Sequence, residues 1–156
     1  MNEGQADYFA ATIDGDPIIG EYVMARAGLP WLRNLTDRVH YPEDLHDDVH
    51  EDGRIWGATL WDLRGALGPQ PTDRLLLASF HYLNGDEPTF TDGLLALLAA
   101  DDALNQGANQ ATIRAVFAKR GIPDGTQTGP VVDGRDLARL MRFAEIHRDR
   151  TAGDGR

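Results

Sequence analysis

Four side chains in the first third of the sequence are of types that take part in chemistry. Glu3 and Asp7 are four residues apart, so on a helix their carboxylates share one face, ~6 Å apart at the backbone. Arg33 can donate two parallel hydrogen bonds to a carbonyl or carboxylate. The ring of His50 can bind a proton and can donate or accept a hydrogen bond. Each also has a plainer interpretation: an acidic first helical turn, a surface arginine and a histidine at a helix start.

The elements that must position these side chains are expected to be helical, and the predicted fold class is all-α. An apolar stripe of Tyr8, Phe9, Thr12 and Ile13 predicts a helix over residues 3–13. A second element is expected around 18–27, and residues 29–48 indicate a long loop of the kind that often forms one wall of a site. Further helices are expected at 50–67, after a cap at Thr72 or Asp73, at 93–103 after a cap at Thr91 or Asp92, from Asn109 or Gln110, and at 134–148.

Composition excludes several classes of function. The chain has 156 residues, which suggests one domain, and a formal charge of −10 from 15 basic and 25 acidic residues. That charge argues against binding to nucleic acid or to anionic membrane surfaces. With no cysteine, disulfides and thiolate zinc sites are excluded. No signal peptide is visible, and no apolar run approaches the ~18 residues that a membrane span needs.

The residues around Glu3 carry a resemblance to a known family. The stretch from Asn2 to Ala10, Asn-Glu-Gly-Gln-Ala-Asp-Tyr-Phe-Ala, resembles the segment that carries the third zinc ligand in thermolysin-like and fungalysin-like zinc metallopeptidases, the gluzincins. The resemblance implies that Glu3 is a zinc ligand. It also implies that Asp7 hydrogen-bonds a zinc-ligand histidine and so orients it, as metal-binding histidines require.

Two later stretches resemble the same family in the same order. Residues 31–37, Trp-Leu-Arg-Asn-Leu-Thr-Asp, resemble the thermolysin segment whose arginine lines the pocket after the scissile bond, and Arg33 is the matching position. Residues 49–62 resemble the fungalysin pattern of Val-His, a short polar run and a Trp-containing helix. By that resemblance His50 stabilises the oxyanion of the tetrahedral intermediate, with Asp47 or Asp48 holding its ring. Thermolysin's orienting aspartate lies five residues before its histidine, where this chain has Leu45.

The resemblance divides the chain into three parts. Residues 1–122 are expected to form a helical lobe like the C-terminal lobe of the thermolysin fold. Residues 123–132, rich in Pro, Gly and Thr, indicate a linker, and residues 133–156 a C-terminal helix and tail.

The sequence contains no His-Glu-x-x-His motif, which in this family supplies two zinc ligands and the general base. The isolated chain is therefore expected to be inactive and to bind zinc weakly or not at all.

Its expected partner is a lobe that bears this motif, or a second copy of the chain, with peptides as substrate once the site is complete. The docking face is expected to expose Tyr8, Phe9 and Ile13. A degenerate, non-catalytic binding module and an unrelated helical protein remain alternatives. The family resemblance suggests secretion.

Overall fold

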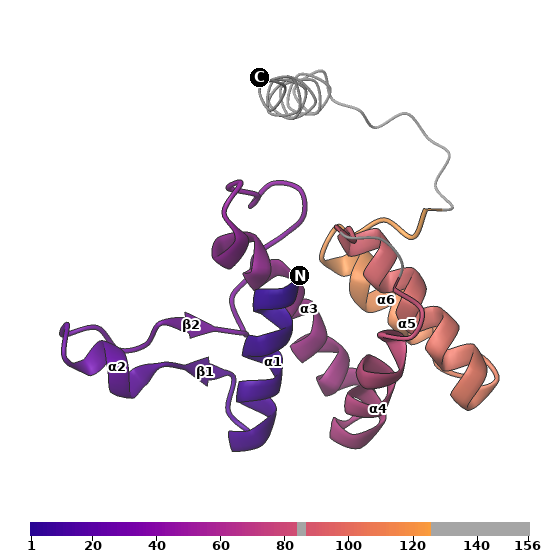
Figure 1. Ribbon diagram of the computed structural model, residues 1–156, viewed down its shortest axis with the longest axis horizontal. Coiled ribbons are helices and arrows are strands. Elements are labelled where there is room, and N and C mark those ends of the chain that lie inside the picture. Colours follow the sequence, from indigo (N-terminus) through magenta and orange to yellow (C-terminus); the bar gives the residue numbers. More distant parts are fainter. Residues whose placement is uncertain (84–86, 126–156) are drawn as a thin grey trace, which may run out of the picture. The chain divides into compact units, whose positions relative to one another are not determined.

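The computed structural model describes residues 1–83 and 87–125. The helix expected at 134–148 and most of the expected linker lie outside these residues. Within them the structure has six helices and one short antiparallel sheet, which confirms the all-α prediction. In chain order these are α1 (Asn2–Asp14), β1 (Ile18–Ile19), α2 (Glu21–Ala25), β2 (Arg33–Asn34), α3 (Val49–Leu67), α4 (Pro69–Ser79), α5 (Phe90–Asn105) and α6 (Gln110–Lys119) (Figure 1).

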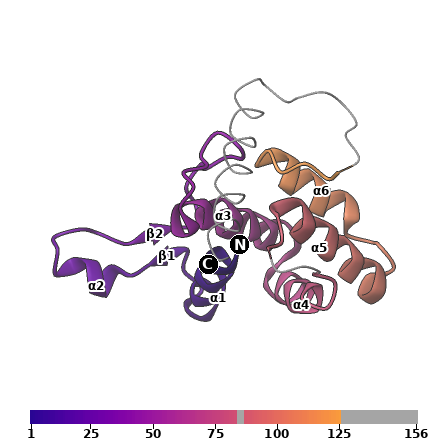
Figure 2. The same ribbon diagram turned by 45° about the horizontal axis from the view of Figure 1, so that its top comes forward.

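Helix α3 is the central element. It packs against α1 on one side and contacts α4 and α6, and α5 contacts both α4 and α6 (Figures 1 and 2). Trp56 is 1% exposed and lies in the core beneath these helices, with its ring stacked on Phe90 at 5.9 Å and edge-on to Phe117 at 5.5 Å between centroids. Among the described helices, none is both long and apolar enough to cross a membrane.

Three glycines allow α1 and α3 to approach at backbone distance. A methyl group on Gly4 would overlap the Gly53 carbonyl oxygen and lie 2.8 Å from the Gly57 nitrogen. A methyl group on Gly57 would in turn lie 3.1 Å from the Gly4 carbonyl oxygen. Only residues without Cβ fit this crossing. Because Gly4 adjoins Glu3, the crossing brings the first turn of α1 against the first turns of α3.

Residues 18–34 form an arm rather than the single element expected around 18–27. Ile18 pairs with Asn34 and Ile19 with Arg33, and α2 lies between the two strands, away from the other helices (Figures 1 and 2). A helix of only five residues cannot bury a continuous face, and α2 has no buried residue. Large apolar side chains are exposed along the arm, namely Tyr22, Val23, Leu29, Trp31 and Leu32.

The starts of two helices differ from expectation. Helix α4 begins at Pro69, whose fixed φ suits a first helical turn, and not after Thr72 or Asp73. Helix α5 is capped by Thr89 in a capping box with Asp92, and not by Thr91 or Asp92.

The face expected to be exposed on α1 is mostly covered. Tyr8 is fully buried, and Phe9 packs edge-on against Phe80 at 6.4 Å. Only Ile13, at 84% exposed, lies open as expected. Apart from Ile13, the exposed large apolar side chains within residues 1–34 therefore lie on the arm and not on the α1 stripe.

Candidate active site

Glu3, Asp7, Arg33 and His50 meet at one place, although they come from three elements. The first turns of α1 carry the two carboxylates, β2 carries Arg33, and the first turn of α3 carries His50. Arg33 lies between the others: its Nη1 donates to Asp7 Oδ1 at 2.9 Å, and its Nη2 is 3.2 Å from His50 Nδ1. Glu3 Oε2 is 3.0 Å from the same ring nitrogen. The sequence-predicted residues therefore form one contiguous polar cluster.

Asp7 is the buried member of the cluster. Its side chain is 8% exposed and that of Arg33 is 15% exposed. Burial raises the pKa of the Asp7 carboxyl, and the Arg33 guanidinium opposes that rise. The second carboxylate oxygen, Oδ2, is buried and accepts no hydrogen bond. A buried acceptor without a donor is costly, so an N–H donor brought to Asp7 Oδ2 would stabilise it.

His50 is more open, with 52% of its side chain exposed. Its Nδ1 faces a carboxylate oxygen of Glu3 and a donor nitrogen of Arg33. One ring nitrogen cannot donate to Glu3 and accept from Arg33 at the same time. The ring therefore pairs with one of the two in each protonation or tautomeric state, while Nε2 takes no part in either contact.

Asp48 holds His50 through the backbone. Its Oδ1 accepts from the backbone N–H groups of His50 at 2.9 Å and Glu51 at 3.0 Å, which caps α3. These bonds also lower the pKa of the Asp48 carboxyl. The ring of His50 is contacted by Glu3 and Arg33, so the expected ring contact with Asp48 is replaced by a helix cap.

The donor set fits part of a zinc site. Among residues 1–83 and 87–125, no three His, Asp or Glu side chains are grouped so as to hold a metal ion. Glu3 is a 41% exposed carboxylate at the edge of the cluster, and the unpaired Asp7 oxygen lies one helical turn away. One carboxylate ligand and one acceptor for a histidine N–H are what a His-bearing partner segment would require.

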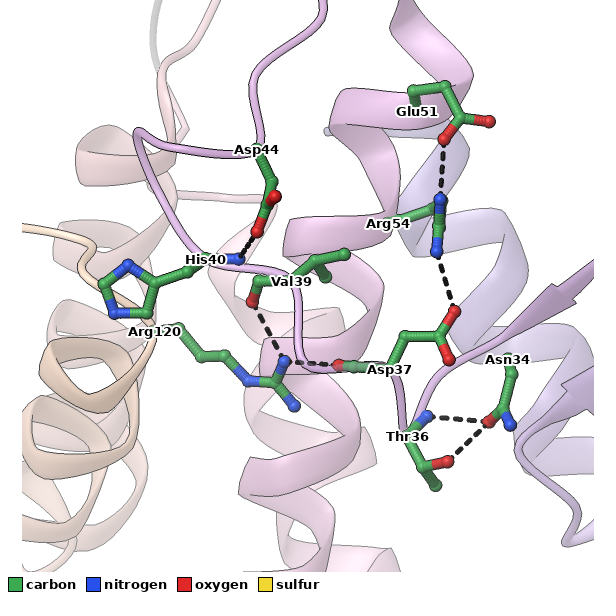
Figure 3. Close-up of polar contacts among 9 residues, drawn as sticks. All are labelled: Asn34, Thr36, Asp37, Val39, His40, Asp44, Glu51, Arg54 and Arg120. Atoms are coloured by element: carbon green, nitrogen blue, oxygen red, sulfur yellow. Dashed lines mark hydrogen bonds and ion pairs between the residues drawn. The ribbon is translucent and has the colours of Figure 1, made fainter.

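The loop between Arg33 and His50 is fastened by charged residues that sequence reasoning did not single out. Asp37 binds Arg54 of α3 at 2.7 Å, and Arg120 donates to the carbonyl oxygens of Asp37 and Val39 (Figure 3). Glu51 and Arg54, three residues apart, are visible in the sequence as a helical ion pair. Arg120 has partners 58 to 83 residues away, and no local pattern indicates such contacts.

Comparison with known proteins relates this chain to extracellular metalloproteinases. The chain is 31% identical over 166 residues to extracellular metalloproteinase 4 of Trichophyton tonsurans, covering 83% of the chain. It is 30% identical over 162 residues to extracellular metalloproteinase MEP of Pyricularia oryzae, covering 81% of the chain. It is 28% identical over 163 residues to extracellular metalloproteinase 2 of Arthroderma otae, covering 83% of the chain.

In each of these three relatives the match covers 26% of the protein's length. No family model matches the chain, and no solved structure matches it. The matched part of the chain is thus a metalloproteinase-related region that spans about a quarter of the curated relatives.

Proposed function

We propose that this chain is the C-terminal part of a zinc metallopeptidase active site, related to the thermolysin-like and fungalysin-like enzymes. The observation that supports the proposal is the convergence of Glu3, Asp7, Arg33 and His50 in one polar cluster, in which Arg33 contacts both Asp7 and His50 and the second carboxylate oxygen of Asp7 has no hydrogen-bond partner. Glu3 would be one zinc ligand, and a His-Glu-x-x-His segment from elsewhere would supply the others. The region's similarity to extracellular metalloproteinases supports the same assignment.

Each side chain has a separate task in the proposed site. Asp7 Oδ2 accepts the N–H of a ligand histidine and fixes its orientation. Arg33 uses one N–H of Nη1 for Asp7, and its remaining donors can bind the carbonyl of a peptide substrate. His50 donates to the substrate carbonyl oxygen as negative charge develops there. When bound, zinc polarises the carbonyl and lowers the pKa of the attacking water.

The isolated chain is proposed to be inactive, since Glu3 is its one assigned ligand and catalytic zinc sites use three protein ligands. Its proposed partner is a lobe that bears His-Glu-x-x-His, and its proposed location is extracellular, as in the relatives. The second candidate is a non-catalytic binding module derived from the same fold. The complete burial of Tyr8 favours that candidate, because α1 needs no further lobe to cover this ring.

Zinc retention in a reconstituted complex tests the proposal. The chain is co-expressed with the His-Glu-x-x-His-bearing lobe of an extracellular metalloproteinase, and zinc is measured by metal analysis after gel filtration. We expect stoichiometric zinc in the wild-type complex and its loss in Glu3→Gln, because the amide is a poor zinc ligand. Glu87→Gln, an exposed residue before α5 and outside the arm, is the matched control. Equal zinc in Glu3→Gln and wild type, or no zinc in either, would contradict the proposal; the latter would favour the binding module.

A further inference from the structure

The strongest feature outside the candidate site is a buried arginine at the end of α6. Arg120 is 7% exposed. Its Nε donates to Asp62 Oδ2 of α3 at 2.8 Å, and its Nη1 donates to the carbonyl oxygens of Asp37 at 2.6 Å and Val39 at 3.0 Å (Figure 3). A buried guanidinium is stable only when its donors are satisfied, and here two of the acceptors belong to the loop between Arg33 and His50.

Both the backbone carbonyl and the side-chain carboxylate of Asp37 are bound by arginines. Its carbonyl accepts from Arg120, and its carboxylate accepts from Arg54 Nη2 at 2.7 Å. Arg54 Nη1 also donates to Glu51, the residue after His50, at 2.7 Å. Asp37 therefore joins the end of α6 to the first turns of α3 that present His50 (Figure 3).

Backbone contacts around Arg120 also hold this loop against the end of α6. The Tyr41 N–H donates to the Arg120 carbonyl oxygen at 2.9 Å. Gly121 has a φ of +76°, and a Cβ there would overlap the Tyr41 carbonyl oxygen and crowd the His40 ring. Residues 37–41 are thus seated directly on the end of α6.

The position of Arg33 depends on these contacts of Asp37 more than the position of His50 does. His50 lies on a 19-residue helix with many buried residues. Arg33 lies on a two-residue strand that pairs with the arm strand β1, and Asp37 follows four residues later. The Asp37 N–H donates to the Asn34 carbonyl oxygen of β2 at 3.1 Å, so we expect a displacement of Asp37 to move the end of β2 relative to α3.

We propose that Arg120 is a positioning residue, which sets the Arg33 guanidinium against His50 and Asp7 by clamping Asp37. The inference rests on the proposed function for its catalytic meaning, because Arg33 and His50 are the side chains assigned there to the substrate. Lysine cannot replace Arg120 fully, since one ammonium cannot reach two carbonyls and a carboxylate with the fixed fork of a guanidinium.

The test reads the site directly in the full chain. In ¹⁵N-labelled protein, the Arg33 Nε–H signal and the His50 ring signals are assigned with Arg33→Lys and His50→Gln and compared in Arg120→Met, Arg120→Lys and wild type. We expect both sets of signals to shift in Arg120→Met, and to a smaller extent in Arg120→Lys. The chemical shifts of the folded molecules do not depend on how large the folded fraction is. A loss of stability alone would therefore not move these signals. If Arg120→Met does not fold, Arg120→Lys alone decides.

Arg114→Met is the matched control, because Arg114 is also on α6 and is ion-paired, to Asp124 at 2.7 Å, away from the loop. Its Arg33 and His50 signals should match those of wild type. Unchanged signals in a folded Arg120 variant, or equal shifts in Arg114→Met, would overturn the inference.

The two proposals fail in different ways. If Arg120→Met shifts the signals but the reconstituted complex holds no zinc, the clamp stands and the peptidase assignment fails. If zinc is retained through Glu3 and Arg120 variants keep the wild-type signals, the assignment stands and the clamp fails.

Discussion

Glu3 and His50 hold each other in this chain, at 3.0 Å between Oε2 and Nδ1. In the proposed enzyme the same carboxylate faces the metal, so Glu3 must exchange its histidine contact for a zinc contact when the partner lobe docks. Arg33 lies 3.2 Å from Nδ1 and can then take over the ring, with Nδ1 as acceptor. The cluster thus has an alternative partner for His50 within hydrogen-bond reach.

The role of His50 can be separated from that of Glu3. In the reconstituted complex, His50→Ala should keep zinc bound, because no ligand is lost. Turnover should fall by roughly 10²–10³-fold, the usual cost of removing one donor to an oxyanion. Peptide hydrolysis and zinc content are measured on the same sample. His81→Ala, an exposed histidine beyond α4, is the control and should keep wild-type turnover. Equal activity after His50→Ala would make His50 only a residue of the helix start.

The buried phenol of Tyr8 leads to a prediction about how the free energy of unfolding depends on pH. Burial, with a hydrogen bond to Asp73 at 2.6 Å, raises the pKa of the Tyr8 phenol to about 12. Between about pH 10 and 12 the unfolded chain loses this proton and the folded chain keeps it, so unfolding becomes easier as pH rises. Tyr8→Phe should flatten that alkaline decline, measured as the free energy of unfolding at several pH values.

The same substitution removes the bond to Asp73, so Tyr8→Phe should also be less stable at neutral pH, by about 1 kcal/mol. Tyr22→Phe, with an 82% exposed ring, is the control and should retain the wild-type profile. A Tyr8→Phe profile parallel to wild type up to pH 12 would show that this phenol does not contribute to the alkaline decline.

At the residue scale, the helical placement of several side chains could be predicted from the local sequence. Glu3 and Asp7 are one helical turn apart, and His50 follows its own cap, whereas the roles of these residues came from the family resemblance and stay predictions. Arg120 could not be found this way, because its partners Asp62 and Asp37 are 58 and 83 residues away. Its contacts become visible only when the helices are packed.

At the scale of elements, the α1–α3 crossing is what brings the cluster together. Gly4, Gly53 and Gly57 let the backbones touch, and this contact fixes Glu3 beside the first turn of α3. The helices themselves followed from apolar spacing, but the starts of α4 and α5 did not. Both starts have local causes, namely a proline at the first helical position of α4 and a capping box from Thr89 to Asp92 in α5.

A methyl group at the crossing should be costly. Gly4→Ala would overlap the Gly53 carbonyl oxygen, and because the obstacle is backbone, one helix must move. Overpacking of this kind costs about 1–3 kcal/mol, so we expect a loss in that range in chemical denaturation. We also expect the Glu3 to His50 contact to be disturbed, seen as a shift of the His50 ring signals.

Gly65→Ala is the matched control for this prediction. Gly65 lies in α3, and no atom lies within 4 Å of its added Cβ. Alanine there should stabilise the chain by up to about 1 kcal/mol, since glycine is a poor helix residue. If both alanine variants were stabilising, the close crossing of α1 and α3 would be wrong.

At the scale of the whole molecule, several exposed large apolar side chains lie on the arm, whereas on the α1 stripe Ile13 is exposed and Tyr8 is buried. Tyr8 and Phe9 are covered because α3, α4 and their neighbours supply enough partners for them. The arm has no such partners among the described residues, and its short strands leave Trp31 at 41% exposed next to Leu32 at 49%. Periodicity identifies apolar residues, but it cannot say which of them the tertiary fold leaves uncovered. Because the arm also carries Arg33, we expect the lobe that is proposed to complete the zinc site to approach along it.

Trp31 can report this approach. The chain has three tryptophans, of which Trp56 is already 1% exposed and Trp61 is half-buried. The measurement is tryptophan fluorescence, and the tryptophans of the His-Glu-x-x-His-bearing lobe are replaced by phenylalanine. When this lobe is added, the emission maximum of the chain should move to shorter wavelength as water leaves the Trp31 ring. Trp31→Phe should abolish the shift, whereas Trp61→Phe should preserve it. A complex that retains zinc through Glu3 but leaves Trp31 emission unchanged would mean that the lobe docks without covering the arm, and the arm would then need another explanation for its exposed apolar side chains.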